Sequence, residues 1–462
     1  MTDYTQSRPG QLLGLVGTMC AALSCGSSAP PPGKVYLEVR LRTPATPNPF
    51  EGVVRVRLTA TGVGMTESKV EAPRSTGEVL LPALPLGAGR VLRLEGLDAT
   101  GTVLSTGQTA PFAVTATTPD AVTIFFSRVD RFSALEAQLA QPRSGHTATA
   151  LADGRVLIAG GTGAQGVLAS VELYDPQTGR FTRLKDLRRA RTHHATARVG
   201  DRVAIVGGEN GTPLTSVELY HPDRGSEAEL QLSMPRAGHT ATALPDGTVL
   251  VVGGPEEKGK PPESAEVIDL SAPSVRPAPR PNQGRRDHVA ALVSGGKLLI
   301  AGGSKEPPAP NAAEGLLDDA SLYDGGARSW NHGVAPLPAP RARAAGATLL
   351  DGSVLVAGGN GPGASRSAAL YRGGSWQTLA LTADHVDLAV APLPRGALVA
   401  GGASTPLAEV FEAGRMRPVA GADLGSERRF LTLTSLPDGT VLAVGGQQGG
   451  TPRGDAFIFK AR

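Results

Sequence analysis

The chain has 462 residues, more than one ordinary compact domain contains, and 40% of them are hydrophobic while only 4% are aromatic. Its 60 Gly and 38 Pro residues, spread among short runs of Val, Leu, Ala and Ile, exclude a disordered chain and a collagen and favour many short strands joined by tight turns. Forty-five Lys and Arg residues against 42 Asp and Glu residues leave a net charge of +3, with no basic tail. We therefore expect no nucleic-acid partner.

The amino-terminal segment has the pattern of an export signal. Arg8 precedes an uncharged stretch whose apolar core, Leu12 to Ser24, would form a helix too short to cross a bilayer. The residues Ala21-Ala22-Leu23-Ser24-Cys25 resemble a bacterial lipobox, although Leu lies one place nearer the cysteine than is commonest. The resemblance implies a signal peptide over residues 1–25, lipidation of Cys25 and an envelope lipoprotein held in the outer membrane or at the cell surface. Plain secretion is the alternative.

Cysteine usage limits the chemistry of the rest of the chain. The two cysteines are Cys20 and Cys25, so disulfides, thiolate zinc sites and cysteine nucleophiles are excluded from residues 26–462. Residues 26–33, rich in Gly, Ser and Pro, are typical of a linker. We expect neither a cofactor nor a metal ion.

Residues 34–130 alternate between apolar and polar side chains without repeating. Examples are Val54, Val56 and Leu58, and the Asp98-Ala99-Thr100-Gly101 segment between two apolar runs is typical of a hairpin turn. About seven such strands favour an immunoglobulin-like β-sandwich.

The remainder of the chain is periodic. Apolar strands such as VLIAGG and VLVVGG end in Gly-Gly pairs that recur every 43 to 56 residues, and a shorter strand such as SVELYD follows each pair. The pairs begin at Gly160, Gly207, Gly253, Gly302, Gly358, Gly401 and Gly445. No helical pattern or Lys-Ser ending follows them, which excludes a phosphate-binding loop.

Over residues 131–462 these seven units resemble the kelch repeat. The resemblance implies an all-β fold, a seven-bladed kelch-type β-propeller preceded by the small sandwich. The last repeat lacks an outer strand, and residues 131–139 have no other place. We therefore predict that this segment pairs with the strand at Asp455 and closes the ring.

Arginine and histidine recur ahead of the Gly-Gly pairs. The arginine lies 17 residues before the pair in five repeats and 16 before it in the second, at Arg143, Arg191, Arg236, Arg285, Arg341 and Arg428. Histidine follows three residues later at His146, His194, His239 and His288, and the sixth repeat has neither residue in register. These arginines either hold the loops between blades or form a ligand-binding face, together with the basic run of residues 183–191. The histidines are expected to bond the backbone or a neighbouring blade, and a metal-binding histidine ring is disfavoured.

The resemblance implies a binding role, since kelch propellers mostly serve as interaction platforms. The predicted function is that of an exported lipoprotein whose propeller binds a protein or a glycan through one face. Two alternatives are an enzyme acting on an acidic sugar, as in kelch-type sialic acid epimerases, and a structural envelope spacer. A buried carboxylate with a raised pKa beside clustered arginines would favour the enzyme.

Overall fold

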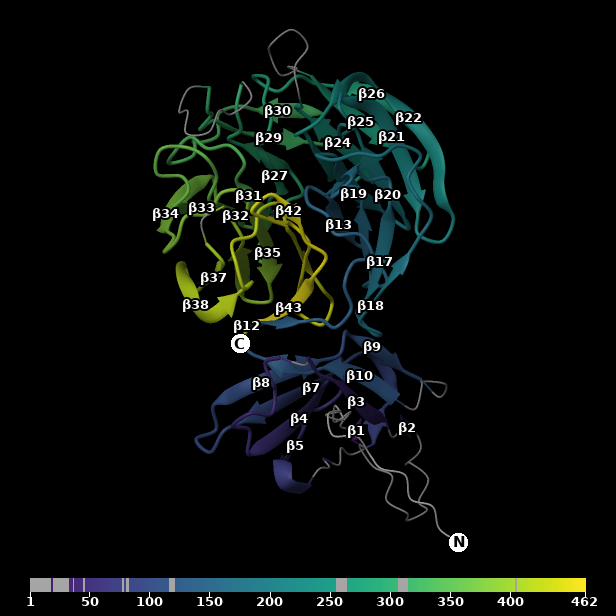
Figure 1. The fold of residues 1–462 in the computed structure, drawn as a ribbon, viewed down its shortest axis with the longest axis vertical. Coiled ribbons are helices and arrows are strands. Elements are labelled where there is room, and N and C mark those ends of the chain that lie inside the picture. Colours follow the sequence, from purple (N-terminus) through teal and green to yellow (C-terminus); the bar gives the residue numbers. More distant parts are fainter. Residues whose placement is uncertain are drawn as a thin grey trace. The chain divides into compact units, whose positions relative to one another are not determined.

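The computed structural model describes residues 18–19, 33–35, 37–44, 46–76, 79, 83–115, 121–254, 264–305, 315–403 and 405–462. The predicted lipidation site at Cys25 and most of the predicted linker lie outside this range. The chain divides into two compact units, residues 1–129 with Arg462, and residues 130–461. Figure 1 shows that both consist of strands. No helix in the described part of the chain is long and apolar enough to cross a membrane.

The first unit contains two main sheets. In the smaller one, β3 (Glu38–Arg42) pairs antiparallel with β1 (Thr18–Met19) and parallel with β10 (Ala121–Phe125). The larger one has the order β11 (Ser127–Arg128), β8 (Val103–Gln108), β7 (Gly87–Leu97), β4 (Arg55–Thr61) and β5 (Ser68–Pro73), with β9 (Phe112–Val114) also on β7. A short pair, β2 (Lys34–Val35) and β6 (Leu84–Pro85), and the 3-10 turn Arg74–Thr76 complete it.

Alternating side chains of both sheets meet in one core, as the period of two predicts. Val39 and Ile124 of the smaller sheet pack in the same cluster as Val56 and Leu94 of the larger one. The predicted hairpin turn lies between β7 and β8, where the Asp98 carboxylate accepts backbone N–H bonds of Thr100 and Thr102. The amino-terminal region is therefore an all-β unit.

The second unit contains seven four-stranded antiparallel sheets among its described residues, named here blades 1 to 7. Blade 1 is β13 (Thr147–Ala150), β14 (Val156–Ala159), β17 (Val171–Asp175) and β18 (Arg180–Arg183). Blade 2 is β19 (Ala195–Val199), β20 (Arg202–Val206), β21 (Leu214–His221) and β22 (Gly225–Arg236). Blade 3 is β23 (Thr240–Ala243), β24 (Thr248–Val252), β25 (Ala265–Asp269) and β26 (Ser274–Ala278). Blade 4 is β27 (Val289–Leu292), β28 (Leu298–Ala301), β29 (Ala320–Asp324) and β30 (Ser329–Asn331).

The same order of strands continues to the end of the chain. Blade 5 is β31 (Ala345–Thr348), β32 (Val354–Ala357), β33 (Ser367–Arg372) and β34 (Ser375–Ala380). Blade 6 is β35 (Ala389–Leu393), β36 (Gly396–Ala400), β37 (Leu407–Glu412) and β38 (Arg415–Asp423). Blade 7 is β39 (Thr432–Ser435), β40 (Val441–Val444), β43 (Ala456–Lys460) and β12 (Arg131–Ala134). Two short ribbons, β15 (Thr162–Gly163) with β16 (Gly166–Val167) and β41 (Gln447–Gln448) with β42 (Thr451–Pro452), follow two of the Gly-Gly pairs.

The innermost strands connect the blades in a closed cycle. Each first strand contacts the first strand of the next blade, and β13 of blade 1 contacts β39 of blade 7. The second strands are continuous apolar runs because both of their faces are covered: all four residues of β14 are buried, and Leu157 and Ala159 pack with Val203 and Ile205 of blade 2. This part of the chain therefore has a propeller-like all-β fold with kelch-type blades.

The predicted closure of the ring is confirmed. β12 pairs antiparallel with β43, with Phe132 opposite Phe459 and Ala134 opposite Phe457. Phe132 is buried and its ring centroid lies 5.2 Å from that of Phe459. Blade 7 is thus assembled from the first and the last segments of this unit.

Removing the closing strand should destabilise the whole ring. For a deletion of residues 131–139, and for Phe132→Ala, which loses about 3–5 kcal/mol of buried ring packing, we expect the melting temperature of the full chain to fall by at least several degrees. The control is Val63→Ala, since Val63 is 83% exposed. Differential scanning calorimetry showing an unchanged transition in both test variants would contradict the closure.

Candidate functional site

The six predicted arginines are buried inside the blades. All are 2% exposed or less. In blade 1, Arg143 Nη1 donates to the carbonyls of Gly160 and Ser170 at 2.9 Å, and Nη2 donates to Ser170 Oγ at 2.8 Å and to Glu172 Oε1 at 2.7 Å. The same set recurs in blades 2 and 3, as Arg191 with Gly207, Ser216 and Glu218, and Arg236 with Gly253, Ser264 and Glu266.

The acid that pairs with the arginine varies among the other blades. In blades 4 and 7 it lies at the position of the serine, where Asp319 accepts from Arg285 at 2.6 Å and Asp455 accepts both Nη groups of Arg428. Blade 5 has Ala369 where blade 1 has Glu172, so Arg341 bonds only backbone and Ser367. Burial without that acid lowers the pKa of Arg341 to about 10.

The sixth blade corrects one prediction. The sequence placed neither the arginine nor the histidine in register there, and with a turn one residue shorter His385 takes the place of the arginine. Its Nδ1 lies 2.7 Å from the carbonyl oxygen of Gly401 and its Nε2 lies 3.2 Å from Glu409 Oε1. The turn of this blade is one residue shorter, as in blade 2, which is why the register hid it.

These contacts favour the structural alternative for the six arginines. The glutamates that pair with them also accept backbone N–H bonds from the loop entering the blade, for example from Ala140 to Glu172 and from Arg188 to Glu218. The guanidinium groups therefore hold the second strand, the third strand and the inter-blade loop together. A ligand-binding role for them stays a prediction. The Ser-x-Glu pattern of the third strand, as in SVELYD, was the sequence signal for their partners.

Each Gly-Gly pair makes room for two turns. Both Gly160 (φ 61°) and Gly161 (φ 97°) are left-handed. A Cβ at Gly160 would lie 2.5 Å from the Arg191 carbonyl oxygen in blade 2, and one at Gly161 would lie 2.9 Å from Cβ of His146 in its own blade. Two constraints therefore favour glycine here, the backbone angle and the close approach of neighbouring segments.

Three of the four predicted histidines bond the preceding blade, as predicted. Nε2 of His146, His194 and His288 lies 2.9–3.1 Å from the hydroxyl of Thr432, Thr147 and Thr240, respectively. Burial is the main cause that lowers the pKa of each histidine, for His146 to about 3, so the imidazoles are neutral near pH 7. The described residues contain no group of three or more His, Cys, Asp or Glu side chains that could hold a metal ion.

A ring of left-handed residues surrounds the axis between these arginines and histidines. In every blade the second residue after the arginine, or after His385 in blade 6, has a φ between 50° and 66°. We call these seven positions the axial turns: Gly145, His193, Gly238, Asp287, Arg343, Asp387 and Phe430. Five of them carry a side chain in a conformation that costs an L-residue about 1 kcal/mol or more.

Hydrogen bonds link one axial turn to the next. The backbone N–H groups of Gly238, Asp287 and Arg343 donate to the carbonyls of His193, Gly238 and Asp287, respectively, at 2.8–3.2 Å. Phe430 N–H donates to Asp387 in the same way. Backbone hydrogen bonds therefore join the axial turns of blades 2 to 5 and those of blades 6, 7 and 1, and the ion pair between Arg343 and Asp387 links blades 5 and 6.

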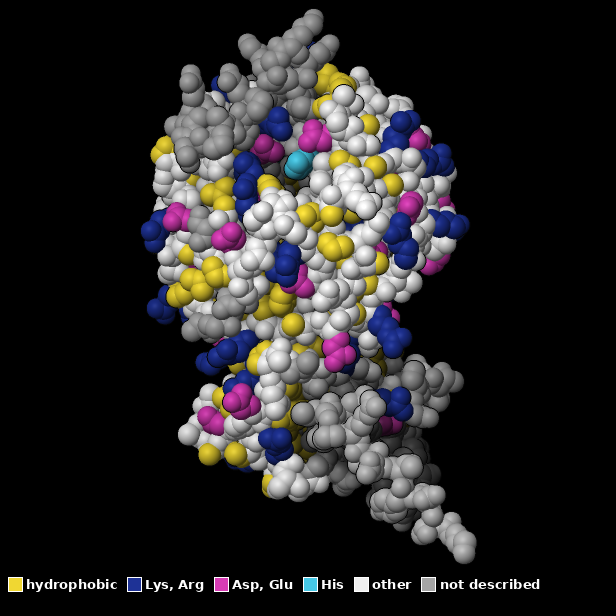
Figure 2. All heavy atoms as spheres, in the orientation of Figure 1, with side chains coloured by type: hydrophobic (Ala, Val, Ile, Leu, Met, Phe, Trp, Pro, Cys, Tyr) yellow, Lys and Arg dark blue, Asp and Glu magenta, His cyan; other side chains and the backbone are white. Residues whose placement is uncertain are grey.

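The axial turns line a pocket of about 690 Å³. His193, Asp287, Arg343, Asp387 and Phe430 contribute to its wall, together with side chains from neighbouring positions. On the face drawn in Figure 2, histidine, acidic and basic side chains lie around a hollow in this unit. A concave site with a few convergent polar groups is the usual form of a small-ligand site.

Asp387 organises one side of the pocket. Its side chain is 1% exposed, accepts a bond from Arg343 Nη2 at 2.5 Å and from Arg429 Nε at 2.8 Å, and so joins blades 5, 6 and 7. Both guanidinium groups also lie over the Phe430 ring, at 5.4 and 5.1 Å from its centroid. Two cations share one anion here.

The carboxylate of Asp287 lies in a different electrostatic environment. Arg286 Nε donates to it at 3.3 Å, and a Cβ on Gly238 would lie 2.7 Å from Asp287 Oδ1, so this carboxylate leans over the glycine of blade 3. Burial raises its pKa, against the opposing effect of Arg286, Arg343 and His193. The pocket thus contains carboxylates in two different electrostatic environments.

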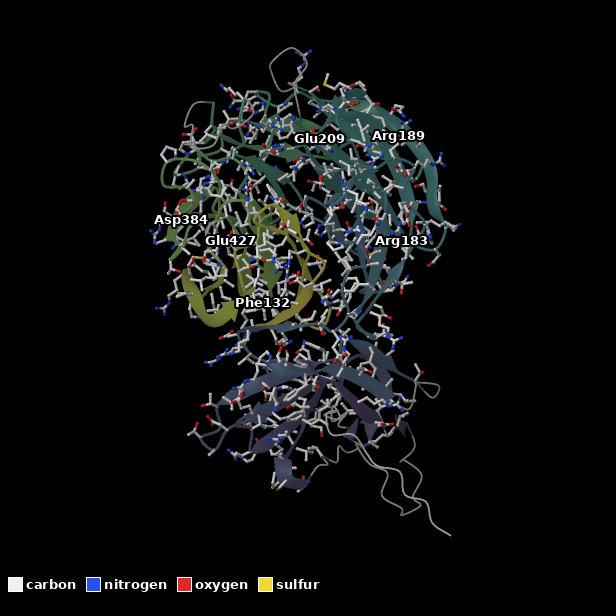
Figure 3. All side chains as sticks on the ribbon, viewed as in Figure 1. Phe132, Arg183, Arg189, Glu209, Asp384 and Glu427 are labelled. Atoms are coloured by element: carbon white, nitrogen blue, oxygen red, sulfur yellow. The ribbon has the colours of Figure 1, made fainter. Side chains whose placement is uncertain are left out.

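The remaining charged groups are paired. Glu209, labelled in Figure 3, contacts His193 Nδ1 at 2.8 Å on the blade 2 side of the pocket.

In the predicted basic run, Arg183 bonds Asp186 at 2.6 Å and Arg189 bonds Glu229 at 3.3 Å; both arginines are also labelled in Figure 3. The positive charges of Arg183 and Arg189 are therefore each paired with an acid.

Sequence comparison identifies the repeat. A family model described as the kelch motif matches residues 142–188, the span of blade 1. The chain contains a kelch motif. No curated protein matches the chain in sequence. A solved structure entitled "Structure of YjhT" is similar with a TM-score of 0.49 and 18% sequence identity, over 61% of this chain and 98% of that chain. Nothing about ligand or activity follows from a likeness at this level.

The buried histidines make stability depend on pH. A histidine whose folded pKa is about 3 takes up a proton on unfolding between pH 6.5 and pH 3, so its contribution to stability is present above pH 6.5 and is lost as the pH falls. We expect His239→Leu to reduce the loss of unfolding free energy between pH 7 and pH 5 by about 1–2 kcal/mol. Urea unfolding at both pH values measures it.

Two features make His239 the informative site. Among the described residues, its ring nitrogens meet no side-chain hydrogen-bond partner, and the Val206 backbone favours the protonated form and so opposes the effect of burial on its pKa. Leu431 fills the equivalent position in blade 7. His194→Leu is the comparison, since it also loses the bond to Thr147 and should destabilise at pH 7. An undiminished pH dependence in His239→Leu would show that this imidazole is not the source.

Proposed function

We propose that this protein is a binding module whose second unit, a seven-bladed kelch β-propeller, takes a glycan or protein partner at the axial pocket. The seven four-stranded sheets in cyclic contact support the number of blades. The two sheets with a shared core support an immunoglobulin-like sandwich for the first unit. The propeller supplies the rigid frame, and the axial turns supply the contacts.

One observation carries the proposal: the seven axial turns share a backbone conformation but differ in residue type. All seven positions share the same left-handed φ, yet their side chains are Gly, His, Gly, Asp, Arg, Asp and Phe. Glycine would satisfy the backbone at every one of them without strain. Five strained, chemically different side chains around one pocket are what a binding site requires and what a scaffold alone does not.

Asp287 favours a second candidate, an enzyme acting on an acidic sugar bound in the same pocket. It is a mostly buried carboxylate with a raised pKa beside Arg286 and near Arg343, while Asp387 is held between two arginines. Two carboxylates in such different surroundings suit the roles of proton donor and acceptor. Neither candidate uses the six buried arginines, whose ligand-binding role stays a separate prediction.

A thermal-shift screen of mono- and disaccharides with the full chain tests the binding function. A sugar at 100 times its dissociation constant stabilises the folded state by about 2.7 kcal/mol, which raises the melting temperature by several degrees. We expect the shift to disappear in Phe430→Ala, which removes the ring under Arg343 and Arg429. The matched control is Arg372→Ala, whose partner Asp351 lies away from the axial turns.

The outcomes separate the candidates. A sugar bound equally well by Phe430→Ala would place the site elsewhere and contradict the proposal. Conversion of a bound acidic sugar, followed by NMR and lost in Asp287→Asn, would establish the enzyme.

We also propose that the protein is exported and anchored by a lipid on Cys25, at the outer membrane or the cell surface. The lipobox-like residues 21–25 support this. Metabolic labelling with a palmitate analogue in a bacterial host should mark the wild type and Cys20→Ala but not Cys25→Ala. Labelling of Cys25→Ala would contradict the anchor.

A further inference from the structure

We propose that the axial pocket holds a carboxylate group of its ligand between Arg286 and Arg343, and that Asp287 regulates this site by competing for the same two arginines. The inference rests on the proposed function, because it names the chemistry that the axial pocket recognises. Its evidence is the geometry of three side chains on blades 4 and 5.

Arg343 is positioned but not saturated. Its side chain is 25% exposed, lines the pocket, and uses Nη2 on Asp387. Among the described residues, no hydrogen-bond acceptor meets its Nε or Nη1. The Phe430 ring and the Asp387 carboxylate fix the plane of the guanidinium group, so its unused N–H groups are preorganised for an acceptor in the pocket.

Arg286 presents a second set of unused donors. Its side chain is 23% exposed and lines the same pocket. Among the described residues this side chain bonds only Asp287, through Nε at 3.3 Å. Within the described part of the chain its two Nη groups have no acceptor. Both Arg286 and Arg343 act electrostatically on Asp287, so the three charges converge on one side of the pocket.

The local charge favours a monoanion. On this side of the pocket three arginines, Arg286, Arg343 and Arg429, face the two carboxylates of Asp287 and Asp387, which leaves +1 for one carboxylate to neutralise. Glu209 bonds His193 on the blade 2 side. A planar carboxylate also matches the two parallel N–H groups that a guanidinium offers. A neutral hydroxyl would leave the charge uncompensated in a partly buried site.

Asp287 is the competing anion. The charged and titratable groups around it are Arg286 on its own turn, Arg343 from blade 5 and His193 from blade 2, and Gly238 of blade 3 packs against it without a side chain. When Asp287 is ionised it repels a ligand carboxylate and satisfies part of the arginine charge. When it is protonated the repulsion ends, so the site binds anions more tightly at lower pH.

The test uses acetate and acetamide, which share size and shape but differ in charge. Each is titrated into the full chain while the side-chain Nε–H NMR signals of arginine are followed, with Arg286→Gln and Arg343→Gln giving the assignments. We expect acetate to shift both signals saturably and acetamide to leave them unchanged. Affinity for acetate should fall at least tenfold in Arg343→Gln and remain unchanged in Arg183→Gln on the outer surface.

Asp287→Asn provides the decisive comparison. Asparagine keeps the shape of aspartate and tolerates the left-handed conformation at φ 53°, so the turn should be preserved. We expect it to bind acetate several-fold more tightly than the wild type at pH 7, and to lose the gain in affinity that the wild type shows as the pH falls. A pH dependence that persisted in Asp287→Asn would assign the effect to His193 and overturn the role of Asp287.

Failure of this inference is distinct from failure of the proposed function. Acetate and acetamide acting alike, or unsaturable shifts, would overturn the carboxylate site. If a neutral sugar were still bound in a way that Phe430→Ala abolishes, the axial pocket would remain the binding site. If neither acetate nor any sugar depended on the axial residues, both would fall.

Discussion

The fold of the second unit depends on a guanidinium group buried at the start of nearly every blade. Removing such a cation from water is expensive unless each N–H group finds an acceptor. The blade provides the carbonyl of the first Gly of the Gly-Gly pair, a serine and an acid of the third strand. Because these acceptors come from the second and third strands, and the acid also accepts N–H bonds from the incoming loop, satisfying one arginine fixes both strands and the loop at once. In blade 6 the imidazole of His385 takes the place of the guanidinium group, and the turn of that blade is one residue shorter.

This constraint explains why the scaffold could be predicted and the site could not. Period-two alternation, apolar second strands and recurrent Gly-Gly pairs are local patterns, and they predicted the sheets and the pairing of the segment 131–139, of which residues 131–134 form the closing strand. The arginines recur because they are structural, so a search for recurrence led to them as site candidates. The axial turns differ in every blade, and only a shared backbone angle, which no residue pattern encodes, brings Asp287, Arg343 and Phe430 together.

The division between repeating and varying positions has an energetic basis. Repeating residues bury their polar atoms and close the contacts between blades, while the axial turns accept strained backbone and partly unsatisfied charge. The backbone hydrogen bonds between neighbouring axial turns and the buried arginines hold those turns in place, so the strained conformation persists. Variation at one axial turn therefore leaves the neighbouring blade contacts in place.

The seam of blade 7 has a consequence for the order of assembly. Arg131 pairs with Lys460, so the strand made first in this unit finds its partner only when the final residues of the chain are available. During synthesis, blades 1 to 6 can stack on one another as they emerge, since each contacts only its neighbours. Until then β12 remains an unpaired edge, exposed to any strand that offers the same alternation. Blades 1 to 6 therefore form an open arc until residues 456–460 have left the ribosome, and the complete ring appears only afterwards.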